Sequence, residues 1–315
     1  MLAIARAKFA TGKLDLFLTF STACNYTCVF CNRDGVKKIV RIEDLGIDLD
    51  ALVNRARSVD ITGYGEPTLH PEFDDIVHRL GARRVPLRFV TNGSRLTTDR
   101  VDLLRSVPIK EIVVSLNSLD PTTYRELHGR NADFDLVVTN TKDLLARRNF
   151  PVAISMVLTS RNLEDIPRLI EFSRVHRPTS LAVLGLTPTI QHLYPPGLTV
   201  DDTPAHRSFL ADMRQYAIRE GVNILLPDLG NQATANAPVP PDRLRAMIRS
   251  CDWVYTKMFV SETGGVAPCC WSRMNMGDLT KQSFEEVWQG DRYRELRQAV
   301  RRGYHPECAN CRRLN

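Results

Sequence analysis

Three cysteines within eight residues are the part of this sequence best suited to chemistry. They lie in the segment Cys24-Asn-Tyr-Thr-Cys28-Val-Phe-Cys31, shortly after an apolar run that ends at Phe20. Three thiolates can cap three corners of a four-iron cluster, whereas a structural zinc site or an electron-transfer cluster normally uses four protein ligands. The spacing therefore predicts a cluster with one iron left open for a substrate or cofactor.

Five more cysteines lie near the end of the chain, and none occurs between Cys31 and Cys251. No apolar run is long enough to span a bilayer, and the N-terminus lacks the features of a signal peptide. We therefore expect a cytoplasmic protein without membrane association, in which clustered cysteines bind metal rather than form disulfides. The C-terminal thiols that could complete a four-ligand site are Cys251, either Cys269 or Cys270, Cys308 and Cys311.

Composition favours an ordinary globular protein over a nucleic-acid binder. The 315 residues include 43% hydrophobic and 25% charged residues, with a formal net charge of +6. The basic residues are dispersed among acidic ones and gather only in short pairs, so we expect a small-molecule substrate rather than nucleic acid. The length allows one large α/β domain, or a large and a small one.

Apolar, β-rich runs alternate with segments of helical periodicity over the first 190 residues. The expected strands are residues 14–20, 59–63, 87–91, 112–116, 152–158 and 181–186. The expected helices are residues 48–57, 71–80, 99–106, 133–147 and 163–174. Six such repeats predict an α/β fold with a parallel sheet, open or curved into a partial barrel.

Polar or glycine-rich segments follow several of these strands. They are residues 63–67, 91–93, 115–118 and 159–161, and the three-cysteine segment follows the first strand in the same way. Because the active sites of parallel sheets form at the carboxyl ends of the strands, we expect all of these segments to meet at one rim.

The second half of the chain is less regular. Residues 188–204 indicate a loop, followed by a helix at 204–220, a short strand at 222–226 and a loop at 228–241. Residues 253–260 and 266–270 flank a glycine turn and predict a hairpin, and a helix is expected at 283–301. We divide the chain into a core of residues 1–205, a connecting region of 206–250 and a small C-terminal subdomain of 251–315.

The cysteine spacing, together with Gly63-Tyr64-Gly65-Glu66-Pro67 after the second strand, resembles the radical S-adenosylmethionine (SAM) superfamily. The hairpin that ends at Cys269, the segment from Gly277 to Trp288 and the final Cys308-x2-Cys311 resemble its auxiliary-cluster extensions, the SPASM and shorter twitch subdomains. The resemblance implies a partial (β/α)6 TIM-like barrel with a small C-terminal iron–sulfur subdomain.

The resemblance also implies cofactors and their ligands. A [4Fe–4S] cluster would be bound by Cys24, Cys28 and Cys31, and SAM would chelate its open iron. One electron would then cleave SAM to methionine and a 5′-deoxyadenosyl radical, which removes hydrogen from a substrate carbon. The residues expected to contact SAM are Phe30, Gly63, Gly65, Glu66, Pro67, Asn92, Ser115 and Asn117.

A second, auxiliary [4Fe–4S] cluster is implied at Cys251, Cys269, Cys308 and Cys311, with zinc as the alternative occupant. The number of cysteines favours the one-cluster twitch form. Cys270 then remains, either as a hydrogen-atom donor to a substrate radical or as a residue that packs on the hairpin.

The activity implied is hydrogen abstraction from a small polar metabolite, a sugar, aminocyclitol or nucleoside of natural-product (antibiotic) biosynthesis. The outcome could be oxidation, dehydration, epimerisation, decarboxylation or carbon–carbon coupling, with an external one-electron donor such as flavodoxin or ferredoxin. Candidate catalytic residues are His192, as the acid or base, Tyr64 and Cys270. Further polar contacts expected on the substrate side are Arg161, Gln191, Tyr194 and Arg273.

Two other functions are compatible with parts of the sequence. Many peptide-modifying maturases carry similar C-terminal regions, but they often have an N-terminal recognition domain, and only about 13 residues precede the first expected strand. A non-enzymatic iron–sulfur or zinc protein would leave the three-cysteine segment and residues 63–67 without a role.

Overall fold

A long, curved sheet organises the molecule. The computed structural model describes residues 13–31, 37–186, 194–229, 240–270, 272 and 274–308. Over these residues the strands follow the order β10-β9-β8-β1-β2-β3-β4-β5-β6-β7, and β8 and β1–β7 pair in parallel. Their bounds are β1 (Leu14–Leu18), β2 (Ala56–Asp60), β3 (Leu87–Thr91), β4 (Ile109–Ser115), β5 (Val152–Leu158), β6 (Ser180–Gly185), β7 (Ile224–Leu225), β8 (Lys257–Val260), β9 (Gly265–Ala267) and β10 (Gly277–Asp278).

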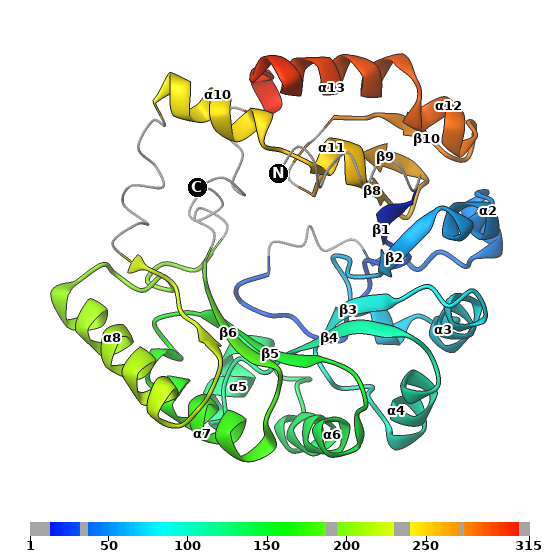
Figure 1. The fold of residues 1–315 in the computed structure, drawn as a ribbon. Coiled ribbons are helices and arrows are strands. Elements are labelled where there is room, and N and C mark those ends of the chain that lie inside the picture. Colours follow the sequence, from blue (N-terminus) through cyan, green and yellow to red (C-terminus); the bar gives the residue numbers. More distant parts are fainter. Residues whose placement is uncertain are drawn as a thin grey trace.

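Helices cover the outside of the sheet, so that the strands form the inner wall of an open ring (Figure 1). This arrangement confirms the partial (β/α) barrel. Every helix in the described ranges is too short or too polar to cross a membrane. The helices are α2 (Leu49–Asn54), α3 (Phe73–Ala82), α4 (Thr98–Arg105), α5 (Pro121–His128), α6 (Phe134–Arg147), α7 (Ile166–His176), α8 (Pro204–Arg219), α10 (Pro241–Arg249), α11 (Trp253–Thr256), α12 (Phe284–Trp288) and α13 (Asp291–Arg302).

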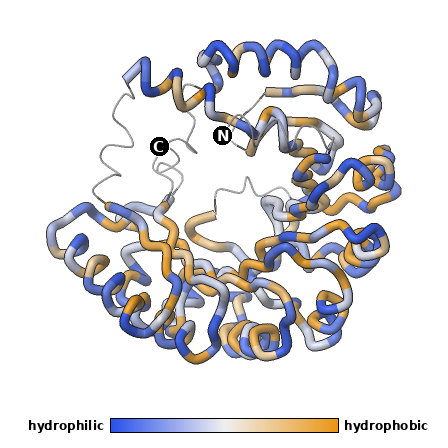
Figure 2. Tube along the Cα trace, in the orientation of Figure 1, coloured by the Kyte–Doolittle hydropathy of each residue, from blue (hydrophilic) through white to orange (hydrophobic). Residues whose placement is uncertain are grey.

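The two faces of the sheet differ in chemistry. The face toward the helices is apolar, and its residues Leu16, Val59, Phe89, Val114 and Ile154 are fully buried. Figure 2 shows the hydrophobic residues gathered along the strands and the hydrophilic ones on the outer helices. Burial of this apolar surface is the main force that holds the ring of helices on the sheet.

The opposite face, which we call the concave face, carries polar and aromatic side chains. Strand register places Phe17, Asp60, Arg88 and Glu111 on it side by side. The Arg88 guanidinium binds Asp60 at 2.7 Å and Glu111 at 3.1 Å. These ion pairs satisfy charges that the inner wall of the barrel would otherwise leave desolvated.

The order of elements agrees with the sequence, whereas several boundaries differ: β2 lies at residues 56–60 rather than 59–63, and β4 begins at residue 109 rather than 112. Residues 56–57 belong to β2 rather than to the preceding helix, and the helix expected at 283–301 is divided into α12 and α13 by Gln289 and Gly290. Helices α5 and α10 were not expected, and the strand expected at 253–260 was wrong over residues 253–256, which form the short helix α11 before β8 begins. The order of strands and helices from β1 to β6 is otherwise as predicted.

The C-terminal segment joins the barrel sheet. Strand β8 pairs in parallel with β1, and the antiparallel strands β9 and β10 continue from it. Across this junction the Phe17 and Phe259 rings stack with centroids 4.2 Å apart. The boundaries at residues 205 and 250 stay predictions, but β8 is structurally part of the same sheet as the core.

Candidate active site

The cysteine loop, residues 24–31, lies between two other segments that hold its backbone. On one side the amide N–H groups of Thr27 and Val29 donate to the last carbonyls of α5, those of His128 and Leu127, at 3.0 and 2.9 Å. On the other side the Glu66 amide donates to the Ala23 carbonyl at 2.8 Å. The loop follows β1, so it occupies the carboxyl-end rim of the sheet, where the sequence placed it.

Both neighbours approach the cysteine loop so closely that only glycine fits. A Cβ atom on Gly65 would lie 2.3 Å from the Ala23 carbonyl oxygen. A Cβ on Gly129 would lie 2.1 Å from the Thr27 hydroxyl, and the φ angle of Gly129 is +90°. The glycine loop, residues 63–67, therefore packs on the backbone that leads into the cysteine loop, and the end of α5 packs on the Thr27 side chain within it.

Glu66 is the central polar group of the glycine loop, and its side chain is 2% exposed. One carboxylate oxygen accepts from the amide and hydroxyl of Thr68 and from the Thr91 hydroxyl, and the other accepts from the Asn92 amide at 2.6 Å. Burial raises the pKa of this carboxyl, and the hydrogen bonds offset part of the rise. Glu66 thus joins the glycine loop to the end of β3, and its contact with SAM stays a prediction.

Asn92 extends that connection to the cysteine loop. Its side-chain amide nitrogen donates to the side-chain oxygen of Asn25 at 2.9 Å and lies 3.9 Å from the Cys24 sulfur. Asn25 in turn donates to Ser94 at 3.0 Å. The predicted rim residues of the second and third strands therefore lie beside the first predicted thiolate ligand.

A second polar group lies on the other side of the loop, at Cys28. The Cys28 sulfur is 3.1 Å from Nδ1 of His128, and Nε2 of His128 is 3.2 Å from the side-chain nitrogen of Asn117. Both His128 and Asn117 are 1% exposed. Burial lowers the pKa of His128 to about 4, so the imidazole is neutral at pH 7.

The remaining residues expected to contact SAM lie close to these groups. Phe30 meets the His128 ring edge to face at 5.8 Å, and Ser115 lies 3.3 Å from Ser155 between adjacent strands. Gly63 and Pro67 line a small cavity with His70. The structure brings these residues to one rim, and their roles toward SAM stay predictions.

Cys31 is exposed, whereas Cys24 and Cys28 are half-buried. Within the described ranges, no three Cys, His, Asp or Glu side chains lie close enough to hold a single metal ion. A cubane cluster differs from a single ion because each thiolate binds a different iron. The donor set of three thiols, with an imidazole N–H group beside one of them, fits such a cluster.

The C-terminal thiols lie on separate elements. Cys251 follows α10, Cys269 follows β9 and Cys308 ends a short helical turn after α13; all three are half-buried, and Cys251 and Cys308 pack against the core. Cys270 is exposed. Cys311 lies outside the described residues, so its ligand role stays a prediction with the other three.

Two buried polar atoms near these thiols lack a partner among the residues that the structure describes. They are Nη2 of Arg297 and the hydroxyl of Tyr293. The Arg297 guanidinium stacks on the Trp288 ring at 4.2 Å, and its other nitrogens donate to the Val254 and Trp288 carbonyls. Burial, with the charge of Cys269 as a smaller contribution, raises the pKa of Tyr293. A buried cation and a hydroxyl near Cys269 fit an anionic, thiolate-bound cluster.

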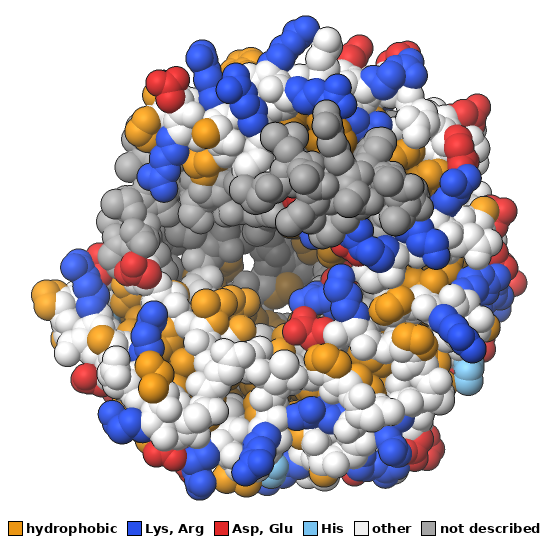
Figure 3. All heavy atoms as spheres, viewed as in Figure 1, with side chains coloured by type: hydrophobic (Ala, Val, Ile, Leu, Met, Phe, Trp, Pro, Cys, Tyr) orange, Lys and Arg blue, Asp and Glu red, His pale blue; other side chains and the backbone are white. Residues whose placement is uncertain are grey.

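The substrate-side predictions are only partly covered by the structure. Tyr64 is 61% exposed at the tip of the glycine loop, and Arg161 is exposed on the loop after β5. His192, Gln191 and Arg273 lie outside the described residues. Figure 3 shows the molecule hollowed at the centre of its ring of elements.

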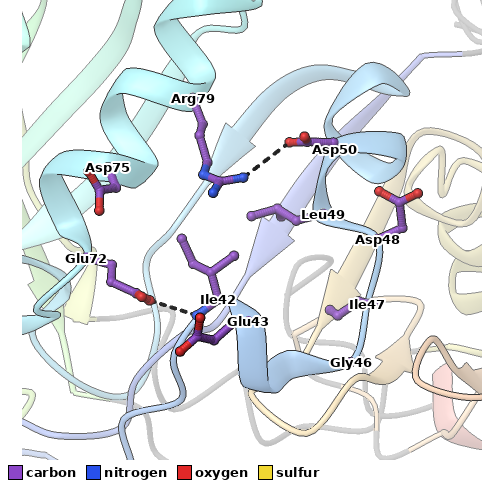
Figure 4. Close-up of a pocket in the computed structure, with 10 residues that line it drawn as sticks. All are labelled: Ile42, Glu43, Gly46, Ile47, Asp48, Leu49, Asp50, Glu72, Asp75 and Arg79. Carbon is purple, nitrogen blue, oxygen red and sulfur yellow. Dashed lines mark hydrogen bonds and ion pairs between the residues drawn. The ribbon is translucent and has the colours of Figure 1, made fainter.

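A separate cavity of about 320 Å³ lies on the outer side of the barrel, between α2 and α3 (Figure 4). Carboxylates dominate its lining, but Asp50 pairs with Arg79 and Arg83, and Glu72 accepts from the Ile42 amide. Since no residue of the cysteine or glycine loop lines it, we do not associate this cavity with the candidate active site.

Sequence reasoning missed His128 and the helix that carries it. The signals were present: Asp120 before Pro121 is a favourable helix start, and the Asp120 carboxylate accepts from the Thr123 amide at 2.8 Å. Gly129 marks the helix end. This helix of eight residues between β4 and α6 was not predicted, because the expected alternation of strands and helices assigned one helix to each strand.

Comparison with known proteins agrees with this geometry. The model of the radical SAM superfamily matches residues 18–173, and that of the SPASM iron–sulfur cluster-binding domain matches residues 251–312. An AdoMet-dependent heme synthase from Methanosarcina barkeri is 24% identical over 93% of this chain and 89% of its own length. A probable GTP 3′,8-cyclase from Sulfurisphaera tokodaii is 30% identical over 53% of this chain, and that match spans about half of the cyclase (54%).

Solved structures share the fold at low sequence identity. Streptococcus suis SuiB bound to S-adenosylmethionine superposes with a TM-score of 0.67 and 19% identity, covering 95% of this chain and 71% of SuiB. The anSMEcpe structure with bound AdoMet gives a TM-score of 0.64 and 17% identity, over 95% of this chain and 86% of that protein. From the two family matches and the rim geometry, we conclude that this chain is a radical SAM enzyme with a C-terminal SPASM domain, and that its cofactors are SAM, a [4Fe–4S] cluster and auxiliary iron–sulfur.

Proposed function

We propose that this enzyme cleaves SAM reductively at a cluster bound by Cys24, Cys28 and Cys31 and abstracts hydrogen from a small polar metabolite. The observation that carries this proposal is the position of the cysteine loop. The loop is held between α5 and the glycine loop at the rim of the barrel, beside the polar concave face. A cluster there would have its open iron next to the space enclosed by the strands.

A cluster held by Cys24, Cys28 and Cys31 would supply the electron that cleaves SAM into methionine and the 5′-deoxyadenosyl radical, the species that takes hydrogen from the substrate. The protein's own part is to hold and orient. Glu66 and Asn92 fix the glycine loop and the end of β3 relative to Cys24, so that backbone groups of the glycine loop are available for the amino group of SAM. Ser115 and Asn117 lie at the end of the next strand, β4, where the Ser115 hydroxyl faces Ser155 and the Asn117 side chain is held by Val157 and His128.

A polar substrate is supported by the chemistry of the concave face. Asp60, Arg88 and Glu111 form a continuous ion-paired row below the rim. Sugars, aminocyclitols and nucleosides carry hydroxyl and amino groups that such a row can recognise through hydrogen bonds. We keep oxidation, dehydration, epimerisation, decarboxylation and carbon–carbon coupling as the outcomes, with His192 as the acid or base and an external flavodoxin or ferredoxin as the electron donor.

A peptide substrate is the second candidate, because two of the similar structures hold a peptide. Among the similar structures are SuiB bound to precursor peptide SuiA, with a TM-score of 0.68, and anSMEcpe with a bound Cp18Cys peptide, with a TM-score of 0.62. At 20% and 18% identity these likenesses support the fold and leave the substrate class to experiment.

Anaerobic reconstitution tests the proposed function. We expect about eight irons per chain, as two clusters of about four, and release of 5′-deoxyadenosine with dithionite and SAM. Products are then sought by mass spectrometry against nucleotide sugars, aminoglycosides, nucleosides, short peptides and heme precursors. A zinc-filled N-terminal site, or a cluster that does not respond to SAM, would refute the proposal, and turnover of a peptide alone would replace the small-metabolite assignment.

A further inference from the structure

We propose that His128 is a positioning residue that donates a hydrogen bond from Nδ1 to the Cys28 sulfur, and that Asn117 fixes the tautomer this requires. In doing so His128 raises the reduction potential of the N-terminal cluster. This inference rests on the proposed function in one respect, that Cys28 binds the cluster. The hydrogen bond itself is a property of the polypeptide.

The geometry leaves His128 little freedom. Its ring is buried between Tyr124, at 4.3 Å between centroids, and Tyr26, at 5.5 Å. Its backbone carbonyl accepts from the Thr27 amide, one residue before Cys28. Both the ring and the backbone of His128 are therefore tied to the segment that carries the thiol, and the 3.1 Å contact with Cys28 is a consequence of both.

The direction of the hydrogen bonds follows from a backbone amide. The Val157 N–H group donates to Oδ1 of Asn117 at 2.7 Å, and an amide N–H cannot accept, so the oxygen of the Asn117 side chain must face Val157. The Asn117 nitrogen then faces Nε2 of His128, which must accept. An imidazole that accepts at Nε2 carries its proton at Nδ1, and this nitrogen faces Cys28.

Asn162 holds Asn117 in place from the loop after β5. Its side-chain nitrogen donates to the Asn117 carbonyl at 2.8 Å and to the Val157 carbonyl at 3.0 Å. Its side-chain oxygen accepts from the Thr159 amide at 2.7 Å, which fixes its own orientation in the same way. A chain of oriented groups thus runs from the end of β5 to the sulfur of Cys28.

Hydrogen bonds to ligand sulfurs are one of the means by which proteins set cluster potentials. The reduced cluster carries one more negative charge than the oxidised one, so an N–H donor at a ligand sulfur stabilises the reduced form more. Because the donor and its orienting residues are buried, this effect is weakly screened by solvent. Loss of the donor should therefore make reduction harder while leaving the thiolate ligand in place.

The test compares three variants by redox titration of the SAM-responsive EPR signal. His128→Phe keeps a ring in the buried site and removes the donor, and we expect the ratio of reduced to oxidised cluster to fall about tenfold at fixed potential, ~59 mV for a one-electron couple. His128→Asn retains a side-chain N–H near the position of Nδ1 and should restore most of the potential. His70→Phe is the matched control, because His70 is also buried (2% exposed) but its ring bonds to the Val40 carbonyl and the Glu72 amide rather than to a cysteine.

An unchanged potential in His128→Phe with full iron content would overturn the inference, as would an equal shift in His70→Phe. If His128→Phe does not assemble a cluster, the test is NMR of the wild-type apoprotein labelled with nitrogen-15 in its histidine rings, which shows where the His128 ring carries its proton. A His128 signal protonated at Nδ1 supports the inference, and one protonated at Nε2 refutes it. Absence of any SAM-responsive cluster in the wild type would instead be a failure of the proposed function.

Discussion

The two cysteine-bearing regions differ in how the fold positions their thiols. The N-terminal cysteines share one short loop, and two neighbouring segments of the barrel hold that loop through backbone contacts. The C-terminal cysteines end separate elements, α10, β9 and the turn after α13. One region thus has its geometry provided by the fold before any metal binds, whereas in the other a cluster would itself join elements that are distant in sequence.

This difference suggests different roles for the two metals. A site formed by the barrel rim can leave one iron open without losing structure, which is what cofactor chemistry requires. A site whose ligands come from distant elements contributes folding energy when it is filled. We therefore expect N-terminal substitutions to affect activity first, and C-terminal ones to affect stability and electron transfer.

The largest effect is expected from the thiols themselves. Cys28→Ala should abolish 5′-deoxyadenosine formation, because the N-terminal cluster loses one of its three ligands. Cys308→Ala should leave that cluster and its SAM-responsive EPR signal intact while total iron falls from about eight to about four per chain. The reverse pattern would show that the chemical and structural roles of the two regions are exchanged.

The next prediction separates the adjacent cysteines of the C-terminal region. Cys269→Ala should lower iron content to about four per chain and reduce the melting temperature, because Cys269 lies close enough to the buried Tyr293 to influence its pKa and a cluster there would join β9 to α13. Cys270→Ala should retain all of its iron, since Cys269 at the end of the hairpin is the ligand we assign. If Cys270→Ala also changes the product, it supports hydrogen-atom donation; equal iron loss in both variants would contradict the choice of Cys269.

A smaller effect is expected in the glycine loop. Gly65→Ala places a Cβ atom against the Ala23 carbonyl, which should destabilise the protein by about 1–3 kcal/mol through overpacking and weaken SAM binding. Tyr64→Ala at the exposed neighbouring position should change the free energy of unfolding by less than about 0.5 kcal/mol. Chemical denaturation and SAM titration measure both, and equal stability of the two variants would argue against the close packing of the two loops.

The smallest effect is expected at Asp15, in the part of β1 that pairs with β8. Burial pushes the pKa of Asp15 upward, but hydrogen bonds from Arg57 and Ser58 and the charge of Lys110 hold it below its usual value. The folded pKa is thus below the unfolded one, so this stabilisation is present above about pH 4 and is lost as the pH falls further. Asp15→Asn should cost about 1 kcal/mol at pH 7 and less at pH 3.

Asp15→Asn should have the same effect with and without the auxiliary cluster, because its partners all belong to the core. Thermal unfolding of Asp15→Asn in the wild-type and Cys308→Ala backgrounds measures this. A larger loss of thermal stability in one background would mean that the auxiliary cluster and the Asp15 ion pairs are energetically coupled.

The barrel and its rim were predictable because strong local signals repeat. Apolar runs bounded by glycine and polar residues defined β3 and β5 to the residue, and the cysteine spacing placed the first loop. The predicted rim residues Glu66, Asn92 and Asn117 do lie around that loop. Their hydrogen-bond partners were beyond sequence reasoning, because which donor meets which acceptor depends on register between strands that are far apart in the chain.

The contact between His128 and Cys28 is the clearest example of what could not be predicted from the sequence. Nothing about a histidine at the end of a short helix indicates that a cysteine 100 residues earlier lies 3.1 Å away. That contact exists because α5 follows β4 and returns its last turn to the loop that follows β1. In the same way, no periodicity in residues 257–260 indicated that they would pair with β1 rather than form an isolated hairpin.

The pairing of β8 with β1 has a consequence for how the chain is made. While the polypeptide is being synthesised, β1 has its β2 neighbour but remains an unprotected edge until residues 257–260 have left the ribosome. Exposed edges of this kind recruit other chains and promote aggregation. Deleting the C-terminal region to remove its metal would uncover the same edge permanently, so side-chain replacement is the cleaner way to separate the two cofactor centres.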